Sequence, residues 1–384
     1  MPFSVYWHLL LVVLPLYLIE MSTPVMSKKI SMIGGGNWGT AMARHLALGN
    51  SDDEVKMWVY EEKIDGRNLT SIINESGVNV KYLPGVRLPP NLKASSDLCA
   101  VCSDADVLFL AIPHQFLPGV LKDMNGLLKE DAIVVSLIKG LTIHEEGPEL
   151  LSTMTSNTLE LRTDVAVLMG ANVASDVAHD ELVEASIACK DRGTAELIKS
   201  IVQKNNFVID MLTTDVASVE LCGALKNVVA LAAGFCDGLG VGSSTKAAII
   251  RKGMQEMVMF CNKFSGDSFN FETILSSCGV ADVIATCFGG RNRKCAEEFA
   301  RRMVLTGESN IGRERASALW KEIESEVLKG QKLQGLGTCH EVITCLASDQ
   351  MDDFMLFPAI YDIAFEGNDV RSLLVGSSVL QSKL

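Results

Sequence analysis

The stretch "SMIGGGNWGTAMARHL", residues 31–46, limits the folds open to this chain more than any other. Lys29 to Ile33 is a short apolar run typical of a buried strand, and from Trp38 onward apolar residues recur at helical spacing. Three consecutive glycines separate the two patterns. The stretch therefore predicts a strand, a glycine turn and a helix in direct succession.

The turn fits a pattern that binds dinucleotides. Gly34, Gly36 and Gly39 match G-x-G-x-x-G, in which the glycines permit a tight turn, admit a pyrophosphate and let helix and strand pack closely. The helix N-terminus, at Asn37 and Trp38, would face the phosphates with free N–H groups and the positive dipole end. Glycine turns also serve plain helix packing, so the motif needs support from its surroundings.

A second predicted strand gives that support. Val55 to Tyr60 is followed by Glu61 and Glu62, about 22 residues past Gly39, where an acidic side chain binds the ribose 2′-OH of a dinucleotide. A carboxylate there would repel a 2′-phosphate. The sequence therefore favours NAD over NADP.

Composition narrows the class of protein. The 384 residues suffice for two domains with substantial cores, and a net charge of −13 argues against nucleic acid as a general partner. Eleven cysteines scattered through apolar runs indicate reduced thiols rather than a disulfide framework. Cys99 and Cys102 form a lone C-x-x-C, which we interpret as part of a loop or helix face rather than a metal or redox site.

The two ends of the chain bear on its location. Residues 1–27 form an apolar extension without a basic leading region or a small-residue cleavage site, and Met26 would be an ordinary start for a cytosolic protein. Translation from an upstream start and a signal-like anchor both remain open. The tail, residues 375–384, ends in Ser382-Lys383-Leu384, the address read by the peroxisomal import receptor. We expect a cytoplasmic protein, with peroxisomal import as an alternative.

Further apolar runs indicate the overall architecture. They cover Val107 to Ile112, Ala132 to Ile138 and Val165 to Met169, and longer connectors separate them. This alternation predicts an α/β, Rossmann-type, doubly wound parallel sheet over residues 28–212. From residue 213 to 374 long apolar helices replace the strands and predict a mainly helical second domain, with a cleft where the halves meet.

Isolated charges in apolar segments mark candidate chemistry. Lys226 is the only formal charge between Glu220 and Asp237, and desolvation there would lower its pKa toward the range of a proton donor and acceptor. Asp282 stands equally alone and would need a partner such as a buried lysine. Snorkelling of the lysine to solvent and helix capping by the aspartate are the structural alternatives.

Two further basic positions follow the same logic. Lys139 lies just past a predicted strand end, where its ammonium could hold developing negative charge. Arg291 and Asn292 follow two glycines in "FGGRNRK", a setting that suits a phosphate monoester. Solvated side chains at a strand end and at a surface turn would produce similar patterns.

Ordered motifs carry a family resemblance. The segments "GGGNWGTA", "NVKYLPG", "PHQF", "SLIKG", "LMGAN", "ELCGALKNVVALAAGFCDGLG", "TKAAIIR", "CGVADVIATCFGGRNRK" and "GQKLQG" resemble, in this order, the eukaryotic NAD-dependent glycerol-3-phosphate dehydrogenases. The resemblance runs from about Lys28 to Gly367. It implies interconversion of dihydroxyacetone phosphate and NADH with sn-glycerol 3-phosphate and NAD, by a homodimer.

The resemblance also implies roles for individual residues. Lys226 resembles the family's catalytic lysine, Lys139 its second active-site lysine and Asp282 the carboxylate that positions the first. The implied substrate-binding residues are Asn172, Asn227, Thr286, Arg291 and Asn292. The implied cofactor-binding residues, beyond the glycine turn and Glu61, are Tyr60, Phe116, Lys139, Ala174, Arg291, Lys332 and Gln334.

Departures from the family pattern are modest. Gly35 stands where many relatives have serine, Tyr60 replaces a usual phenylalanine and Phe288 a usual tyrosine. None removes a charged group assigned to chemistry. Two other readings stay open: a catalytically silent dinucleotide-binding scaffold that docks on a membrane or ion channel, and a related 2-hydroxy acid or phosphogluconate dehydrogenase sharing the Rossmann half.

Overall fold

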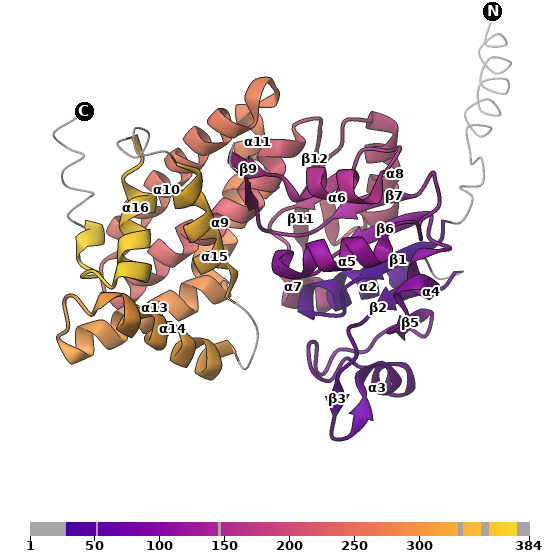
Figure 1. The fold of residues 1–384 in the computed structure, drawn as a ribbon, viewed down its shortest axis with the longest axis horizontal. Coiled ribbons are helices and arrows are strands. Elements are labelled where there is room, and N and C mark those ends of the chain that lie inside the picture. Colours follow the sequence, from indigo (N-terminus) through magenta and orange to yellow (C-terminus); the bar gives the residue numbers. More distant parts are fainter. Residues whose placement is uncertain (1–27, 51–52, 145–146, 329–332, 347–352, 375–384) are drawn as a thin grey trace, which may run out of the picture.

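A computed structural model describes residues 28–50, 53–144, 147–328, 333–346 and 353–374, which form two lobes side by side (Figure 1). The apolar extension, Lys332 and the Ser-Lys-Leu tail lie outside the described residues. The sheet ends at Thr213 and the first long helix begins at Val216, on either side of the domain boundary predicted at 212/213. That boundary stays a prediction.

The N-terminal lobe is built on an eight-stranded sheet in the order β12-β11-β10-β7-β6-β1-β2-β5. Its strands are β1 (Ile30–Ile33), β2 (Val55–Trp58), β5 (Leu92–Ser95), β6 (Val107–Leu110), β7 (Ile133–Ser136), β10 (Ala166–Met169), β11 (Val183–Ala188) and β12 (Phe207–Thr213). The chain runs outward from β1 in both directions. The strand order therefore reverses between β1 and β6, the place where doubly wound sheets bind nucleotides.

The strands formed by the predicted apolar runs, β1, β2, β6, β7 and β10, are parallel as expected, and the sheet becomes mixed only where β11 joins it. All neighbouring strands are parallel except β10 and β11, which are antiparallel. The connection between them holds only the five-residue helix α7 (Ala174–Ala178). So short a helix cannot return the chain along the six-residue β11, as a parallel crossover requires.

Helices cover both faces of this sheet (Figure 1). They are α2 (Asn37–Gly49), α3 (Leu69–Ser76), α4 (Leu98–Cys102), α5 (Leu117–Met124), α6 (Leu151–Leu159), α7 and α8 (Arg192–Val202). Two small hairpins, β3 (Lys63–Ile64) with β4 (Arg67–Asn68) and β8 (Thr142–His144) with β9 (Gly147–Glu149), lie outside the main sheet. The single-turn segment η1 (His114–Phe116) follows β6 directly.

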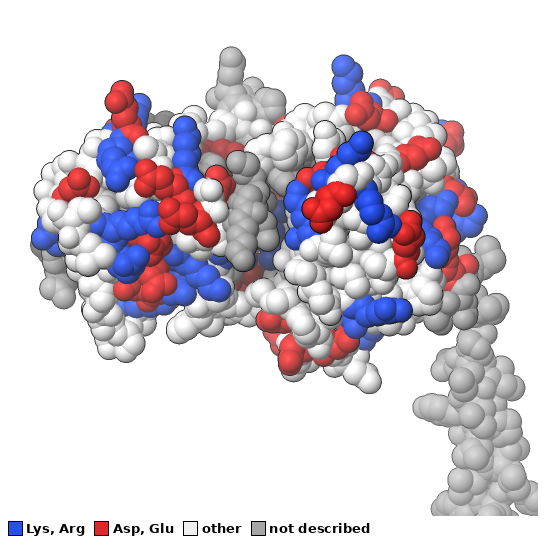
Figure 2. All heavy atoms as spheres, turned by 90° about the horizontal axis from the view of Figure 1, so that it is seen from below, with Lys and Arg blue, Asp and Glu red and all other residues white. Residues whose placement is uncertain are grey.

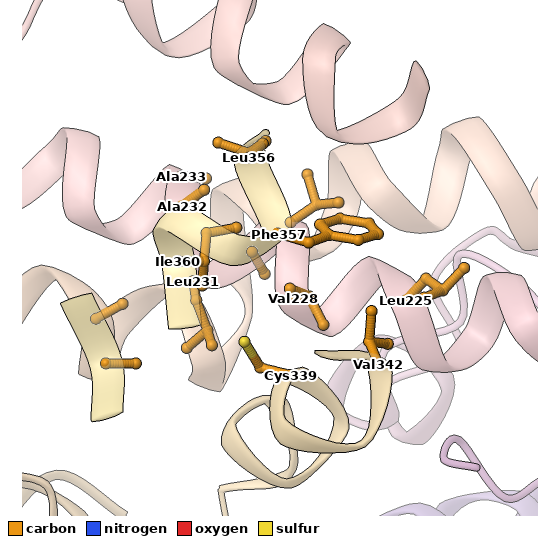
Figure 3. Close-up of a cluster of buried hydrophobic side chains, with 14 of the residues drawn as sticks. Leu225, Val228, Leu231, Ala232, Ala233, Cys339, Val342, Leu356, Phe357 and Ile360 are labelled. Carbon is orange, nitrogen blue, oxygen red and sulfur yellow. The ribbon is translucent and has the colours of Figure 1, made fainter. Parts of the chain in front are cut away.

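The C-terminal lobe is helical, as predicted, and is centred on α9 (Val216–Gly238). Around α9 are α10 (Ser243–Phe264), α11 (Phe271–Leu275), η3 (Ser277–Ala281), α12 (Asp282–Gly289), α13 (Arg291–Thr306), α14 (Gly312–Leu328), α15 (Gln334–Cys345) and α16 (Leu356–Tyr361). Figure 3 shows side chains of α9 such as Leu225 and Leu231 beside Val342 of α15 and Phe357 of α16. Among the described residues, α9 alone is long and apolar enough to cross a membrane, and 89% of that window is buried inside the protein.

Charged side chains are mixed on the visible surface. On the face seen in Figure 2, the described acidic and basic side chains are interspersed over both lobes rather than gathered by sign.

The eleven cysteines are all free thiols, with Cys99 exposed and Cys102 buried on the short helix α4. The described residues contain no cluster of three or more metal-ligating side chains.

Backbone geometry explains the glycine turn. Gly34 has a φ of 125°, and a Cβ there would lie 2.4 Å from the carbonyl oxygen of Ala111, just beyond β6. A Cβ on Gly39 would lie 1.9 Å from the carbonyl oxygen of Gly34. At Gly36 a Cβ meets nothing within 4 Å. Two glycines therefore close the turn, while the third leaves open space at the start of α2.

This difference predicts that alanine lowers the stability of the cofactor-free protein at Gly39 but not at Gly36. In Gly39→Ala the new Cβ clashes with the Gly34 carbonyl oxygen, so the turn and the helix must move apart. This overpacking should destabilise the protein by at least about 2 kcal/mol. Gly36→Ala should leave the urea midpoint unchanged and weaken only dinucleotide binding. Urea unfolding followed by circular dichroism measures both, and equal midpoints for the two variants would contradict the assignment.

Candidate active site

The open side of the glycine turn has the features of a pyrophosphate site. No side chain caps the N-terminus of α2, and Gly36 leaves the approach to its first turn clear. Asn37 Oδ1 and Trp38 Nε1 are buried, and neither has a hydrogen-bond partner among the described residues. An open helix N-terminus beside unpaired polar atoms fits a dinucleotide.

The acidic residues after β2 are already engaged. The Glu61 carboxylate accepts hydrogen bonds from Thr70 N at 3.2 Å and Thr70 Oγ1 at 2.5 Å, and so fixes the start of α3. Glu62 pairs with Lys81 and accepts a bond from Tyr82 at 2.5 Å. The two carboxylates keep negative charge past β2, but direct ribose binding by Glu61 stays a prediction.

Two aromatic side chains stand exposed beyond the ends of β2 and β6, the two strands that flank β1. Tyr60 follows β2 and is 74% exposed, while Phe116 in η1 follows β6 and is 60% exposed. Large aromatic groups left in solvent beyond the carboxyl ends of parallel strands offer stacking surface for a base or ribose. Their positions are compatible with the adenosine side predicted from the sequence.

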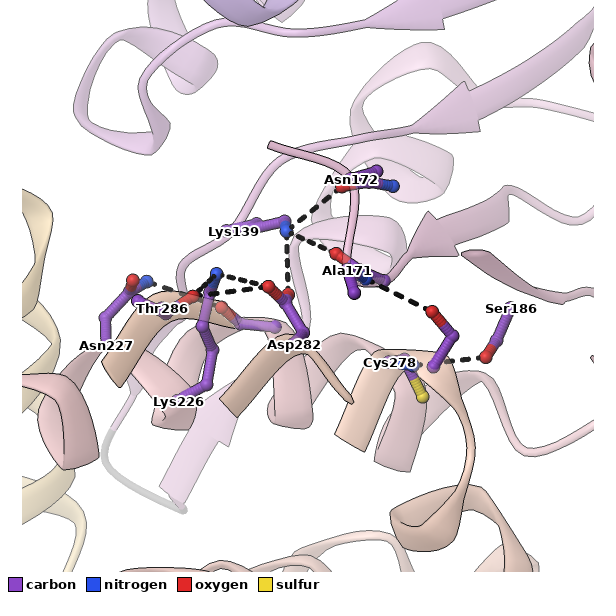
Figure 4. A network of polar contacts seen from close by, with 12 residues as sticks. Lys139, Ala171, Asn172, Ser186, Lys226, Asn227, Cys278, Asp282 and Thr286 are labelled. Atoms are coloured by element: carbon purple, nitrogen blue, oxygen red, sulfur yellow. Dashed lines mark hydrogen bonds and ion pairs between the residues drawn. The ribbon is translucent and has the colours of Figure 1, made fainter. Parts of the chain in front are cut away.

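A carboxylate between two lysines joins the lobes (Figure 4). Asp282, at the start of α12, accepts from Lys226 of α9 at 2.6 Å and from Lys139, just past β7, at 2.7 Å. Lys226 and Asp282 are 6% and 1% exposed. The structure therefore confirms that Asp282 pairs with a buried lysine, and Asp282 does so through its side chain instead of capping a helix.

Burial and the facing charges lower the pKa of both Lys226 and Asp282, for different reasons. Burial lowers the pKa of Lys226 to about 8, with Asp282 opposing the change and Lys139 adding to it. Burial alone would raise the pKa of Asp282, but the charges of Lys139 and Lys226 overcome it and hold that pKa below the usual value. Asp282 is thus a fixed anion next to a lysine that can exchange a proton near neutral pH.

Polar groups surround the ammonium ends. Lys226 Nζ also donates to Thr286 Oγ1 at 2.6 Å, and Lys139 Nζ donates to the Gly170 carbonyl at 3.2 Å and to Asn172 Oδ1 at 3.4 Å (Figure 4). Asn172 Nδ2 is buried without a hydrogen-bond partner in the described structure. That amide could donate to a substrate oxygen. Asn172 and Thr286 therefore gather at the lysines, as the family resemblance implies.

Asn292 is the clearest structural link among the predicted substrate residues. Its Nδ2 donates to Asn227 Oδ1 at 2.8 Å, and its Oδ1 accepts from Gly335 N at 3.0 Å. The start of α13 is thereby tied to α9 and α15, beside Gln334. Asn292 thus has amide bonds within the protein, and its contact with substrate stays a prediction.

Arg291 begins α13 next to this link. The side chain reaches the surface, yet the protein around its guanidinium lowers its pKa by desolvation. A guanidinium presents a planar fork of N–H donors that matches the geometry of a phosphate. Ala174 begins α7, close in sequence to Asn172, and Lys332 lies outside the described residues.

The sequence did not predict one polar contact between the lobes. His114 Nε2 lies 3.0 Å from Glu341 Oε1 on α15. His114 stands in "PHQF", which already marked a strand end, but Glu341 sits in a helix of mixed polarity with nothing to single it out. Only the tertiary structure brings the two together.

A glycine-turn dinucleotide fold and a lysine-carboxylate group at the junction with a helical lobe define the class as two-domain dinucleotide-dependent dehydrogenases. The particular family follows from comparison. The NAD-dependent glycerol-3-phosphate dehydrogenase N-terminus matches residues 29–195 and the corresponding C-terminus residues 215–375. The chain belongs to the NAD-dependent glycerol-3-phosphate dehydrogenase family.

Individual relatives agree. The chain is 45% identical to rat cytoplasmic glycerol-3-phosphate dehydrogenase [NAD(+)] over 353 residues, covering 90% of this chain and 96% of the rat protein. The structure of the Dunaliella salina enzyme has a TM-score of 0.83 and 40% identity, covering 91% of this chain and 60% of that longer one. The Saccharomyces cerevisiae enzyme has a TM-score of 0.77 and 36% identity, covering 91% and 99%. The predicted fold class, family and NAD dependence are confirmed.

The charge arrangement predicts a large stability cost for losing the central anion. Asp282→Ala leaves two ammonium groups facing each other with little water, and breaking a buried pair in this way costs about 3–5 kcal/mol. The exposed ion pair of Asp104 with Lys29 provides the control, since Asp104→Ala should leave stability unchanged. Urea unfolding compares them, and an Asp282→Ala loss no greater than the control would refute the buried-anion role.

Proposed function

We propose that this chain catalyses the reversible, NAD-linked interconversion of dihydroxyacetone phosphate and sn-glycerol 3-phosphate. The observation that carries the proposal is the buried group of Lys226, Asp282 and Lys139 where a dinucleotide fold meets the helical lobe. Family membership supports the same reaction, since the relatives are named as NAD(+) glycerol-3-phosphate dehydrogenases.

When bound, NADH would supply a hydride to the carbonyl carbon, and the protein's own residues position the substrate and stabilise charge. Lys226 gives the proton of its ammonium to the carbonyl oxygen as that carbon becomes tetrahedral, and its neutral amine takes the proton back in the reverse direction. Lys139 stabilises the negative charge that develops on the oxygen. Asp282 holds both ammonium groups toward that oxygen.

The non-reacting end of the substrate is held separately. Arg291 binds the phosphate through its guanidinium, while Asn172 and Thr286 bind the hydroxyl and carbonyl end beside the lysines. Asn227, in the middle of α9, and Asn292, at the start of α13, keep these two helices in register through their mutual hydrogen bond. Binding energy from the phosphate is thus available to orient the carbonyl.

The proposed cofactor site lies at the carboxyl ends of β1, β2 and β6. Gly34, Gly36 and Gly39 with the start of α2 accept the pyrophosphate, and the exposed aromatics Tyr60 and Phe116 line the adenosine side. The remaining proposed cofactor contacts are Asn37, Trp38, Glu61, Lys139, Ala174, Arg291, Lys332 and Gln334.

We extend the proposal to location and assembly. The cytoplasmic names of the relatives support a cytoplasmic protein. Ser382-Lys383-Leu384 supports additional recognition by the peroxisomal import receptor, which imaging with and without Leu384 tests. A homodimer is proposed from the family resemblance, and analytical ultracentrifugation measures it.

The decisive experiment follows NADH oxidation by purified protein. Dihydroxyacetone phosphate should support turnover, whereas dihydroxyacetone should be a much poorer substrate because it gives Arg291 no phosphate. Lys226→Ala should lower kcat by about 10²–10⁴-fold, the range for a lost general acid, with NADH still bound. NADH binding without turnover by the unaltered protein would instead favour the silent scaffold.

The lowered pKa of Lys226, about 8, predicts opposite pH limbs in the two directions. Reduction needs the ammonium, so its kcat/KM should fall as pH rises above about 8. Oxidation needs the neutral amine, so its kcat/KM should rise with pH and level off above about 8. Initial rates from pH 6 to 10 measure both, and limbs of the same sign in both directions would exclude Lys226 as the proton carrier.

A further inference from the structure

Another polar bridge between the lobes lies next to the lysine-carboxylate group. His114, in η1 after β6, lies with Nε2 at 3.0 Å from Glu341 Oε1 on α15. The two side chains are 6% and 18% exposed. The bridge therefore connects the segment after β6, at the carboxyl ends of the central strands, to α15, the helix that begins at Gln334.

The other edge of the His114 ring packs on the backbone next to Lys139. A Cβ on Gly140 would lie 2.5 Å from Nδ1 and 2.8 Å from Cγ of that ring, so the ring fills the space that any larger residue would need. Lys139 itself reaches Asp282 on α12. The Lys139-Gly140 segment is thus restrained twice, and both restraints end in the helical lobe.

Each side chain of the bridge also has a buried polar atom without a hydrogen bond in the described structure. His114 Nδ1 and Glu341 Oε2 are buried, and neither has a hydrogen-bond partner among the described residues. Each side chain therefore depends on the other for the hydrogen bond that offsets its burial. An apolar pair would fill the same space without this cost, so packing alone does not account for the choice of residues.

We propose that His114 and Glu341 are positioning residues, which align the two lobes so that Lys139 reaches Asp282 and the reacting oxygen. The inference rests on the proposed function, because the role is defined by the chemistry of Lys139. The pair itself is given no contact with substrate. Its loss should impair turnover through Lys139 while leaving the glycine turn intact.

The experiment compares disruptive with conservative variants of each partner. Glu341→Leu and His114→Asn remove the bridge and should lower kcat at least tenfold. Glu341→Gln keeps an oxygen at the Oε1 position and His114→Gln keeps a nitrogen near the Nε2 position, so both should stay within threefold of the unaltered protein. His179→Asn, an exposed histidine of the same lobe, is the matched control and should not change kcat.

Two further readouts separate positioning from general damage. The Kd for NADH without substrate should change less than twofold in the single variants of His114 and Glu341, because the pyrophosphate turn of Gly34, Gly36 and Gly39 lies outside the bridge. Adding Glu341→Leu to Lys139→Met should lower kcat less than twofold beyond Lys139→Met alone. Full multiplication of the two losses would overturn the proposal.

Folding and function are checked together. Circular dichroism and urea midpoints identify a variant that does not fold, and the variant at the other end of the bridge then provides the test from the opposite lobe. Unchanged kcat in a folded Glu341→Leu or His114→Asn variant would overturn the inference. Absent turnover in the unaltered protein would overturn the proposed function itself.

Discussion

The carboxylate of Asp282 is the interaction on which the rest of the site depends. It is 1% exposed and bonded to two ammonium groups, one from each lobe, so it allows two cations to approach in a place with little water. The three groups together leave one excess positive charge. A fixed positive charge in a low-dielectric site stabilises a developing oxyanion without solvent reorganisation. Because Lys139 and Lys226 come from different lobes, the arrangement exists only when the lobes are aligned.

Close helix packing brings the substrate side to the same place. A Cβ on Gly234 of α9 would lie 2.2 Å from the carbonyl oxygen of Arg293, and one on Gly238 would lie 2.4 Å from that of Glu297. Glycine at both positions lets α13 lie directly against α9. The start of α13 then falls beside Lys226, with Asn292 bonded to Asn227. The apolar character that buries α9 is also what lowers the pKa of its lysine.

Local signals predicted the parts of the fold and site that depend on local physics. The glycine turn at Gly34 could be predicted because three glycines interrupt an apolar strand and helix pattern. Lys226 and Asp282 could be singled out because each is a lone charge in an apolar segment. The antiparallel direction of β11 could not be predicted, since the pairing of strands depends on contacts that form only in the folded sheet. The Thr70 hydrogen bonds of Glu61 and the His114 bridge to Glu341 were missed for a similar reason: a polar residue in a polar segment does not reveal its partner.

The chain as a whole repels the substrate that its site is proposed to bind. Its net charge is −13, and dihydroxyacetone phosphate is itself an anion. At physiological ionic strength, however, charges farther than about 8 Å are largely screened, so distant surface carboxylates contribute little. At close range the substrate is proposed to meet cations instead, with its phosphate at Arg291 and its carbonyl end at Lys139 and Lys226. The local group of two lysines about the Asp282 carboxylate, with Arg291 at the start of α13, rather than the overall charge, therefore governs the proposed binding of a small anion.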